Sequence, residues 1–314
     1  MAMTQFQKRI PVSVVGGFLG AGKTTLVNHL VATGQQRFGI IVNEFGETGI
    51  DGSLIENVDT DGIAELSNGC LCCVGREDLV SALFKLIGRK DKPEYILIEL
   101  SGLADPVPVA QTIMDPFARI KFELDSIIGV ADARNLEQTL RDGPEGAVQL
   151  AYASTVVLNK TDLATPEQIA EAENLIRKIN PLAQVYCTAQ SKVNPEEVLH
   201  KRAFDLDWKP QHHTHLHTPD VQTFTLTAER LLERQKVNEF IDQYLISRPD
   251  RVFRAKGFLS VRGFEKQVLF QSVREIFSLE HAQTPPSAPS RLVVIGRGLN
   301  RFEYEEAFQA LQVQ

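Results

Sequence analysis

The chain has few cysteines and no long apolar run, and each absence excludes a class of protein. Four cysteines in 314 residues cannot form the dense disulfide framework of a small secreted domain. No stretch reaches the roughly 18 apolar residues of a membrane-spanning helix. The apolar residues 10–19 follow Lys8 and Arg9, as in a secretory signal, but glycines interrupt them and Lys23 follows soon after. We therefore expect a cytoplasmic protein with no membrane partner.

Basic residues are also fewer than acidic residues. Lysine and arginine number 33 against 40 aspartates and glutamates, which gives a formal net charge of −7. Nucleic acids bind basic surfaces, so this balance argues against a nucleic-acid partner. A hydrophobic content of 43% is ordinary for a globular protein. The length suits two domains better than one.

Short apolar runs alternate with helical patterns over the first two thirds of the chain. The expected strands are residues 12–15, 39–43, 95–99, 126–131, 155–158 and 184–187. The expected helices include residues 24–33, 76–87 and 166–179. Strands that are apolar on both faces and separated by helices are typical of a mostly parallel sheet with helices on both sides. We predict an α/β domain of the P-loop class over residues 1–207.

The alternation stops at residues 208–219, which contain two prolines and four histidines and show no apolar period. This composition predicts a linker. Beyond it, strands are expected near residues 222–227, 256–261, 267–271 and 291–295, with helices at residues 228–246 and from about residue 303. We predict a smaller α+β domain over residues 220–314.

A phosphate-binding loop follows the first expected strand. Residues 17–24, GFLGAGKT, match the pattern G-x-x-x-x-G-K-[ST] in full, with a strand before and a helix after them. Glycines let backbone N–H groups converge on phosphate oxygens, and the helix N-terminus favours negative charge. Lys23 is expected to reach the β and γ phosphates, and the Thr24 hydroxyl to bind Mg²⁺. The alternative, a glycine-rich turn that binds nothing, does not explain the flanking elements. The expected phosphate-binding residues are Gly17, Gly20, Ala21, Gly22, Lys23, Thr24 and Thr25.

The base is predicted from residues 159–162, Asn-Lys-Thr-Asp, which directly follow a late strand. The Asp162 carboxylate can accept hydrogen bonds from both N1–H and the exocyclic amine of guanine, a pair that adenine lacks. A helix-capping turn is the alternative reading of these four residues. After a late strand of a phosphate-loop protein, they favour GTP. Thr188 and Ala189, after the next strand, are placed to close over the base.

A third nucleotide-related feature is Glu99, the carboxylate that ends the apolar strand 95–99. This is where phosphate-loop enzymes hold Mg²⁺, often through water, and where a switch loop senses the γ-phosphate. The alternative is a solvated strand end, but Ser101 and Gly102 follow and favour a switch. Residues 43–47 are the candidate for a second switch. We predict Lys23, Thr24 and Glu99 as the catalytic residues. No arginine finger or water-positioning glutamine is evident, so we expect slow intrinsic hydrolysis.

Three of the four cysteines, Cys70, Cys72 and Cys73, fall within four residues. Thiolates are soft ligands and select Zn²⁺ or Cu(I) over Mg²⁺. A closed structural zinc site takes four ligands, usually as two separated pairs, and the chain has no second pair. The fourth ligand must come from Glu47, a histidine, water or a partner, so the site suits a metal that is handed on. The alternative is a cluster of buried, inert cysteines, which the polar residues on either side disfavour.

The thiol motif lies between the two candidate switches in sequence. If the γ-phosphate orders those switches, it changes the thiol geometry and the metal affinity. Thermodynamic linkage then requires the metal to change nucleotide affinity by the same factor.

The chain has other histidines and one other cysteine that could in principle bind a metal. Histidines 212, 213, 215 and 217 lie in the predicted linker, where a solvated segment and a weak metal-collecting segment are equally good interpretations. Cys187 lies on an expected strand, and we predict it to be buried in the core.

The motifs occur in one order that resembles a known family. They are GFLGAGKT at residues 17–24, NEFGE at 43–47, NGCLCC at 68–73, ELSGLADP at 99–106 and NKTD at 159–162. This arrangement resembles the CobW-type metallochaperone GTPases, relatives of the urease- and hydrogenase-maturation GTPases. The resemblance extends over nearly the whole chain, including the smaller C-terminal domain.

The resemblance implies roles for particular residues. Residues 17–24 would bind the phosphates of GTP, while Asn159, Lys160 and Asp162 would bind guanine. Cys70, Cys72 and Cys73 would carry the transferable metal, which is zinc in most members and cobalt in some. Many relatives have a longer histidine run, which leaves the role of residues 212–217 open.

Three functions follow as hypotheses. The first is a GTPase that couples GTP binding and hydrolysis to delivery of Zn²⁺ to a client metalloprotein, with a dimer that forms in response to nucleotide or metal. The second is a metal buffer or sensor in which hydrolysis is incidental. The third, a small-molecule kinase, is weakest because residues 159–162 favour guanine and no acceptor-site base is evident.

Overall fold

The computed structural model describes residues 9–43, 63–66, 76–102, 104–201, 216–217, 221–286 and 288–313. The chain divides into two compact units. The first comprises Met1–Thr139, Ala153–Ala172 and Gln184–Ala203, and the second comprises Leu140–Tyr152, Glu173–Ala183 and Phe204–Gln314. Each unit is built around its own sheet.

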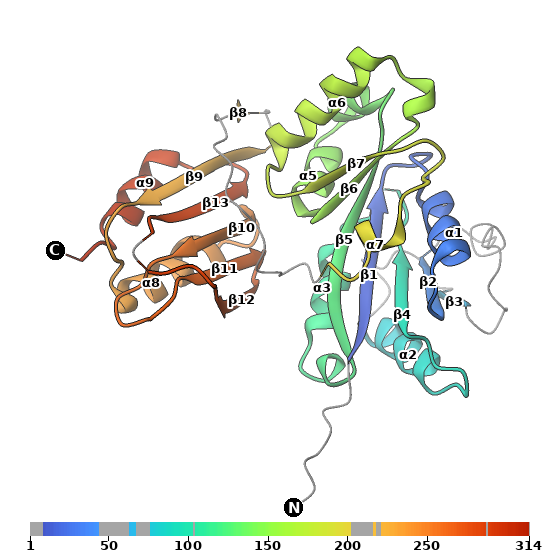
Figure 1. The fold of residues 1–314 in the computed structure, drawn as a ribbon, viewed down its shortest axis with the longest axis horizontal. Coiled ribbons are helices and arrows are strands. Elements are labelled where there is room, and N and C mark those ends of the chain that lie inside the picture. Colours follow the sequence, from blue (N-terminus) through green and yellow to red (C-terminus); the bar gives the residue numbers. More distant parts are fainter. Residues whose placement is uncertain are drawn as a thin grey trace, which may run out of the picture. The chain divides into compact units, whose positions relative to one another are not determined.

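The sheet of the first unit has seven strands in the order β3-β2-β4-β1-β5-β6-β7, and every neighbouring pair is parallel (Figure 1). The strands are β1 (Ile10–Gly17), β2 (Phe38–Asn43), β3 (Ile63–Leu66), β4 (Tyr95–Glu99), β5 (Phe122–Asp132), β6 (Thr155–Asn159) and β7 (Gln184–Cys187). All residues of β4 and β6 are buried, which explains why their sequences are apolar on both faces.

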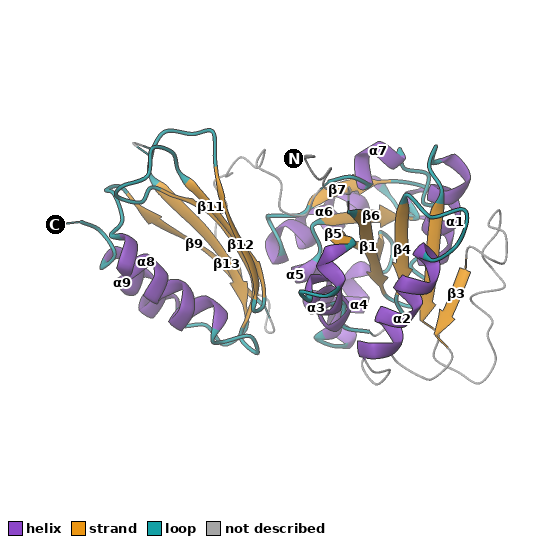
Figure 2. Ribbon diagram, turned by 90° about the horizontal axis from the view of Figure 1, so that it is seen from below, coloured by secondary structure: helices purple, strands orange, loops and turns teal. Residues whose placement is uncertain are grey.

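Helices lie in the connections between these strands because each parallel connection must cross from one strand end back to the other. They are α1 (Lys23–Thr33), α2 (Arg76–Ile87), α3 (Val107–Met114), α4 (Leu136–Asp142), α5 (Glu145–Tyr152), α6 (Pro166–Ile179) and α7 (Pro195–Val198). The end of α4, all of α5 and the second half of α6 belong to the second unit. Short 3₁₀ turns occupy η3 (Ala118–Ile120) and η4 (Thr161–Leu163). The β1–α1–β2 and β4–α3–β5 crossovers run in opposite directions along the sheet, so the right-handed rule puts α1 and α3 on opposite faces (Figure 2).

The sequence predicts most of this unit. All six expected strands are confirmed, as are the helices at residues 24–33, 76–87 and 166–179, to within a residue or a few at their ends. The short strand β3 was not predicted. The prediction for Cys187 is wrong: its side chain is exposed, because β7 is the edge strand of the sheet and has a neighbour on one side only.

The sheet of the second unit has six antiparallel strands in the order β12-β11-β10-β13-β9-β8. They are β8 (Leu216–His217), β9 (Gln222–Ala228), β10 (Val252–Leu259), β11 (Val268–Val273), β12 (Ile276–His281) and β13 (Ser290–Gly296). Helix α8 (Arg234–Phe240), the π-helical turn η5 (Ile241–Ile246) and α9 (Arg301–Gln309) pack on the sheet (Figure 2). Their shared core includes Phe224, Phe270, Val294, Phe240 and Tyr304, all buried.

The second unit has the α+β character that the sequence predicts, with two differences. The helix expected from residue 228 begins at Arg234, since Leu232 forms isolated bridges with Val261 and Gln312 and holds residues before the helix in an extended path. Strands β8 and β12 were not predicted, and β8 lies within residues 208–219, which the sequence predicts to be a linker. The domain bounds at residues 207, 219 and 220 stay a proposal. No helix in the described part of the chain is long and apolar enough to cross a membrane.

Candidate functional site

The phosphate-binding loop lies at the carboxyl end of β1, in the centre of the parallel sheet, and leads directly into α1. Gly22, immediately before α1, has a left-handed φ of 107°. A Cβ at this position would lie 2.3 Å from Nδ2 of Asn159. Only glycine therefore permits both the backbone conformation and the approach of the base-side loop.

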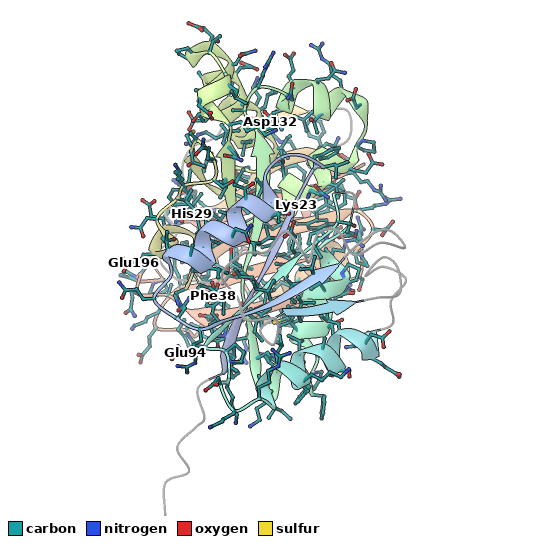
Figure 3. All side chains as sticks on the ribbon, turned by 90° about the vertical axis from the view of Figure 1, so that its right-hand side faces the viewer. Lys23, His29, Phe38, Glu94, Asp132 and Glu196 are labelled. Atoms are coloured by element: carbon teal, nitrogen blue, oxygen red, sulfur yellow. The ribbon has the colours of Figure 1, made fainter. Side chains whose placement is uncertain are left out.

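Lys23 and Thr24 open helix α1, and their side chains have different partners. Lys23 lies at the start of α1 (Figure 3). It is buried, and its Nζ donates to the Phe18 carbonyl at 3.1 Å, so the side chain folds back over the loop. Thr24 Oγ1 donates to Glu99 Oε1 at 2.7 Å. Glu99 ends β4, whose residues pair with β1 in the register Val15↔Glu99, and it is only 3% exposed. The structure thus brings Thr24 and Glu99 into contact and directs Lys23 to the phosphate loop, and the catalytic role of the three residues stays a prediction.

A Mg²⁺ ion prefers hard oxygen ligands. The Thr24 hydroxyl and the Glu99 carboxylate are such ligands, and they meet beside the N-terminus of α1. The donor set therefore fits the ion that a phosphate-loop enzyme uses.

The segment after β4 touches the phosphate loop. A Cβ on Gly102 would lie 2.7 Å from the backbone nitrogen of Leu19, so this approach also requires glycine. The hydroxyl of Ser101 is buried and has no hydrogen-bond partner within the described part of the chain. A buried polar atom without a partner is rare in a folded protein. This segment therefore lies against the phosphate loop, and its role as a switch stays a prediction.

Asn159, the last residue of β6, connects two loops. Its Nδ2 donates to the Ala21 carbonyl at 3.0 Å, and its Oδ1 accepts from Ser191 N at 2.7 Å. Ser191 Oγ in turn donates to the Gly22 carbonyl at 3.2 Å. Gln190 and Ser191 both adopt left-handed φ angles, 53° and 54°, a conformation that costs free energy in residues other than glycine. The loop after β7 is therefore fastened to the phosphate loop through Asn159.

Sequence reasoning missed Ser191. The signal available was its place just after Thr188 and Ala189, which follow β7. Thr188 Oγ1 donates to the Lys192 carbonyl at 2.9 Å and closes this short loop upon itself.

Lys160 follows Asn159 in a left-handed conformation, with a φ of 61°. Its Nζ lies 2.8 Å from Asp132 Oδ2, at the end of the neighbouring strand β5. Partial burial by itself would raise the pKa of Asp132, but hydrogen bonds from Lys160 and Asn135 outweigh this effect and lower it. Asp162 lies in the η4 turn with an exposed side chain. Asp132 was not predicted, because its role depends on the neighbouring strand.

The predicted metal site lies outside the described residues: this holds for Glu47, Cys70, Cys72 and Cys73. Histidines 212, 213 and 215 are also outside them, and only the backbone of His217 is described, in β8. Among the residues that the structure describes, no group of three or more histidines, cysteines or carboxylates is placed to hold a metal ion.

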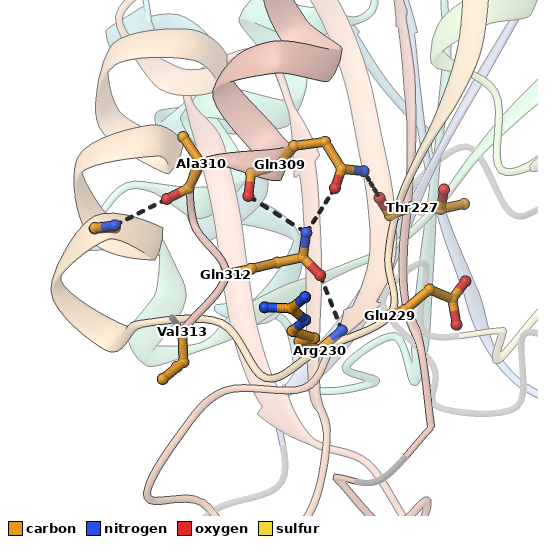
Figure 4. A pocket seen from close by; sticks show the side chains of 8 residues that line it. Thr227, Glu229, Arg230, Gln309, Ala310, Gln312 and Val313 are labelled. Atoms are coloured by element: carbon orange, nitrogen blue, oxygen red, sulfur yellow. Dashed lines mark hydrogen bonds between the residues drawn. The ribbon is translucent and has the colours of Figure 1, made fainter.

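The second unit has a polar pocket of about 670 Å³ between the end of β9 and the C-terminal segment (Figure 4). Gln312 Nε2 donates to Gln309 Oε1 at 2.6 Å, and its Oε1 accepts from Arg230 N at 3.0 Å. Lys236 Nζ donates to the Ala310 carbonyl at 2.9 Å. These bonds attach the end of the chain to the segment that follows β9 and to α8. None of the residues predicted to bind nucleotide lines this pocket.

Comparison with known families agrees with this architecture. The family described as CobW/HypB/UreG, nucleotide-binding domain, matches residues 11–187. The family described as Cobalamin synthesis protein cobW C-terminal domain matches residues 221–312. Together the two matches span the parallel-sheet region and the antiparallel sheet.

Individual relatives carry related names. The chain is 30% identical to the zinc chaperone YjiA of Escherichia coli, over 96% of this chain and 99% of that protein. It is 31% identical to the zinc chaperone CobW of Pseudomonas aeruginosa, over 93% and 89%. It is 29% identical to zinc-regulated GTPase metalloprotein activator 1 of Schizosaccharomyces pombe, over 93% and 83%.

A solved structure shows the same fold. A Zn(II)-bound triple mutant of the YjiA GTPase superposes with a TM-score of 0.77 at 25% identity, covering 98% of this chain and 100% of that one. The two family matches and the full-length relatives settle the classification. The chain belongs to the CobW/HypB/UreG family and is a GTPase of its zinc-regulated metallochaperone group.

Proposed function

We propose that this GTPase couples GTP binding and hydrolysis to the delivery of Zn²⁺ from Cys70, Cys72 and Cys73 to a client metalloprotein. Co²⁺ is the alternative cargo. The observation that carries the proposal is the position of the segments on either side of the thiol motif. Three residues separate the end of β3, at Leu66, from Cys70, and two separate Cys73 from the start of α2, at Arg76.

The topology connects these segments to the nucleotide site. All strands of the sheet are parallel, so the carboxyl ends of β2 and β3 lie at the same edge as the phosphate loop. The chain leaves that edge after β3, passes through the thiol motif and returns in α2. A change at the γ-phosphate can therefore reach the thiols over a short path. Glu47, four residues beyond the end of β2 at Asn43, remains the proposed fourth ligand.

The nucleotide roles belong to the same proposal. Lys23 neutralises charge on the β and γ phosphates, and backbone N–H groups of residues 17–25 hold their oxygens. Thr24 and Glu99 would hold Mg²⁺, which supplies further positive charge at the phosphates. The Asp162 carboxylate accepts hydrogen bonds from N1–H and the exocyclic amine of guanine. Asn159 acts by fastening the base-side loop to the phosphate loop.

A direct experiment measures zinc stoichiometry and affinity in the full chain and in a variant with Cys70, Cys72 and Cys73 all changed to serine. The proposal expects the triple variant to lose its tight zinc site while it keeps GTP binding. Tight zinc binding by that variant would place the main site elsewhere, for example at the linker histidines. Repeating the titration with Co²⁺ identifies the preferred cargo.

The competing function is a zinc buffer or sensor with incidental hydrolysis. Both functions need the thiols, so the cysteine variant does not separate them. They differ in whether the nucleotide state changes zinc affinity, because a buffer has no need of that coupling. The names of the relatives, zinc chaperones and a metalloprotein activator, favour delivery.

A further inference from the structure

The ammonium of Lys160 forms an ion pair with Asp132, a carboxylate on the neighbouring strand β5. The Lys160 Nζ lies 2.8 Å from Asp132 Oδ2, and the two side chains are 30% and 12% exposed. Asp132 ends β5 directly beside Asn159, its partner in the parallel register. The Lys160 side chain therefore extends from the turn after β6 to the end of the neighbouring strand β5.

Asp132 is held firmly in place. Its Oδ1 accepts from the backbone nitrogens of Arg134 and Asn135 at 3.0 and 3.3 Å. Its Oδ2 accepts from Asn135 Nδ2 at 3.0 Å in addition to Lys160. A carboxylate with this many donors cannot rotate freely, so it provides a fixed anchor for the ammonium.

The anchored ammonium limits what Lys160 can offer a nucleotide. A charge already paired with a carboxylate at 2.8 Å is poorly suited to bind a phosphate, and Lys23 already occupies the phosphate loop. The part of Lys160 that can still contact a nucleotide is its four-carbon stem, which forms an apolar surface even when the ammonium is in a polar contact. Flat aromatic rings such as a purine base pack well on such a surface.

We propose that Asp132 is a positioning residue for guanine-nucleotide binding: it holds the stem of Lys160 as one wall of the base pocket. Asp132 acts through Lys160 and does not touch the nucleotide. The inference rests on the proposed base site at residues 159–162. It adds a residue from a different strand, which the Asn-Lys-Thr-Asp pattern does not contain.

The experiment measures GDP affinity and steady-state GTP hydrolysis in the full chain for Asp132→Asn, Lys160→Ala and the double variant. Asp132→Asn should weaken GDP binding about twofold to fivefold, the range for losing one well-formed, partly exposed ion pair. The KM for GTP should rise by a similar factor with kcat unchanged, because bound nucleotide still meets the same phosphate loop. Asp132→Glu keeps the negative charge and should therefore weaken GDP binding less than Asp132→Asn does.

Coupling between the two positions is the sharper readout. If Asp132 acts through Lys160, Asp132→Asn should have no further effect on GDP affinity in the Lys160→Ala background. An equal loss in both backgrounds, or no loss in either, would overturn the proposal. Glu94→Gln, which removes the exposed pair with Arg37, is the matched control and should leave GDP affinity unchanged.

Asp162→Asn separates this inference from the base site on which it rests. If Asp162→Asn does not reduce the preference for GTP over ATP, the base site itself is wrong. If Asp162→Asn reduces that preference while Asp132→Asn leaves GDP affinity intact, only the role of Asp132 is wrong. The free energy of unfolding without nucleotide identifies any variant that acts by destabilising the fold.

Discussion

Thr24 and Glu99 are 75 residues apart in sequence, yet the threonine hydroxyl donates to the glutamate Oε1 at 2.7 Å. This bond connects the helix that starts at the phosphate loop to the strand whose continuation touches that loop at Leu19. In the proposed function, a Mg²⁺ ion that binds here would replace or share this bond, and the pair would connect the nucleotide to the segment after β4.

Glu99→Gln tests this role. The amide keeps the size of the side chain and an oxygen that accepts from Thr24, but it removes the negative charge. We expect Mg²⁺-dependent GTP hydrolysis to fall about 10- to 100-fold, the usual effect of losing a group that holds a metal through water. GDP binding without Mg²⁺ should change little. A variant with full hydrolysis would show that Glu99 is a structural strand end.

Gly22→Ala tests the contact between the phosphate loop and Asn159. Any Cβ at position 22 collides with the Asn159 amide, whereas a Cβ at Gly20 meets nothing within 4 Å. Both glycines have positive φ angles, so both alanine variants carry strain of about 1–2 kcal/mol.

Only Gly22→Ala must also displace the amide and its buried hydrogen bonds. Nucleotide titration should therefore show a loss of GDP affinity about tenfold greater for Gly22→Ala than for Gly20→Ala. Equal losses would mean that the approach of Asn159 is unimportant for binding.

Asn159→Ala removes two buried hydrogen bonds and leaves the Ala21 carbonyl and the Ser191 nitrogen without this partner. We expect the free energy of unfolding of the nucleotide-free protein to fall by about 2–3 kcal/mol. Denaturant titration measures it. Asn194→Ala is the control, since Asn194 caps the short helix α7 through one bond to Glu196 N and should cost about 1 kcal/mol. A smaller cost at Asn159 than at Asn194 would contradict the role of Asn159 as a fastener.

Tyr95→Phe tests a buried polar cluster below the nucleotide site. Tyr95 donates to Asp125, lies 2.6 Å from Ser13 Oγ and is fully buried. The variant deprives a buried carboxylate of a donor and should lose about 2 kcal/mol of stability at neutral pH. Thermal or denaturant unfolding gives the value, and a neutral effect would show that Asp125 is satisfied without Tyr95.

The same residue predicts a pH dependence. Burial raises the pKa of Tyr95 well above its usual value, and the charge of Asp125 adds to the shift. An unfolded tyrosine ionises near pH 10, so above about pH 10 the unfolded chain releases a proton that the folded protein retains. The contribution of Tyr95 to stability is therefore complete below pH 10 and declines as the pH rises further. The stability difference between wild type and Tyr95→Phe should shrink above pH 10, and a difference that stays constant would exclude the shift.

The parallel sheet was predictable because its central strands, such as β4 and β6, are buried on both faces and therefore have continuous apolar sequences. The phosphate loop was predictable because backbone geometry demands glycines at fixed spacing. Strand β3, Ile63–Leu66, lacks both signals, since it is short and contains a glutamate. Cys187 was misplaced because an edge strand and a central strand have similar local sequences.

Residues that act across strands were beyond the reach of sequence patterns. Asp132 and Ser191 are unremarkable within their own segments, and their importance arises only when β5, β6 and β7 lie side by side. The late start of α8 has a similar cause, because the bridges of Leu232 with Val261 and Gln312 override a helical pattern.

Nucleotide-coupled delivery requires that the nucleotide state control zinc affinity. Chelator competition on the full chain, with saturating GDP and then with a non-hydrolysable GTP analogue, measures it directly. Nucleotide-coupled delivery predicts zinc affinities that differ at least about fivefold between the two states, with Cys72→Ser abolishing the difference. Equal zinc affinities in the GDP and GTP-analogue states would contradict the account and leave a zinc buffer with incidental GTPase activity.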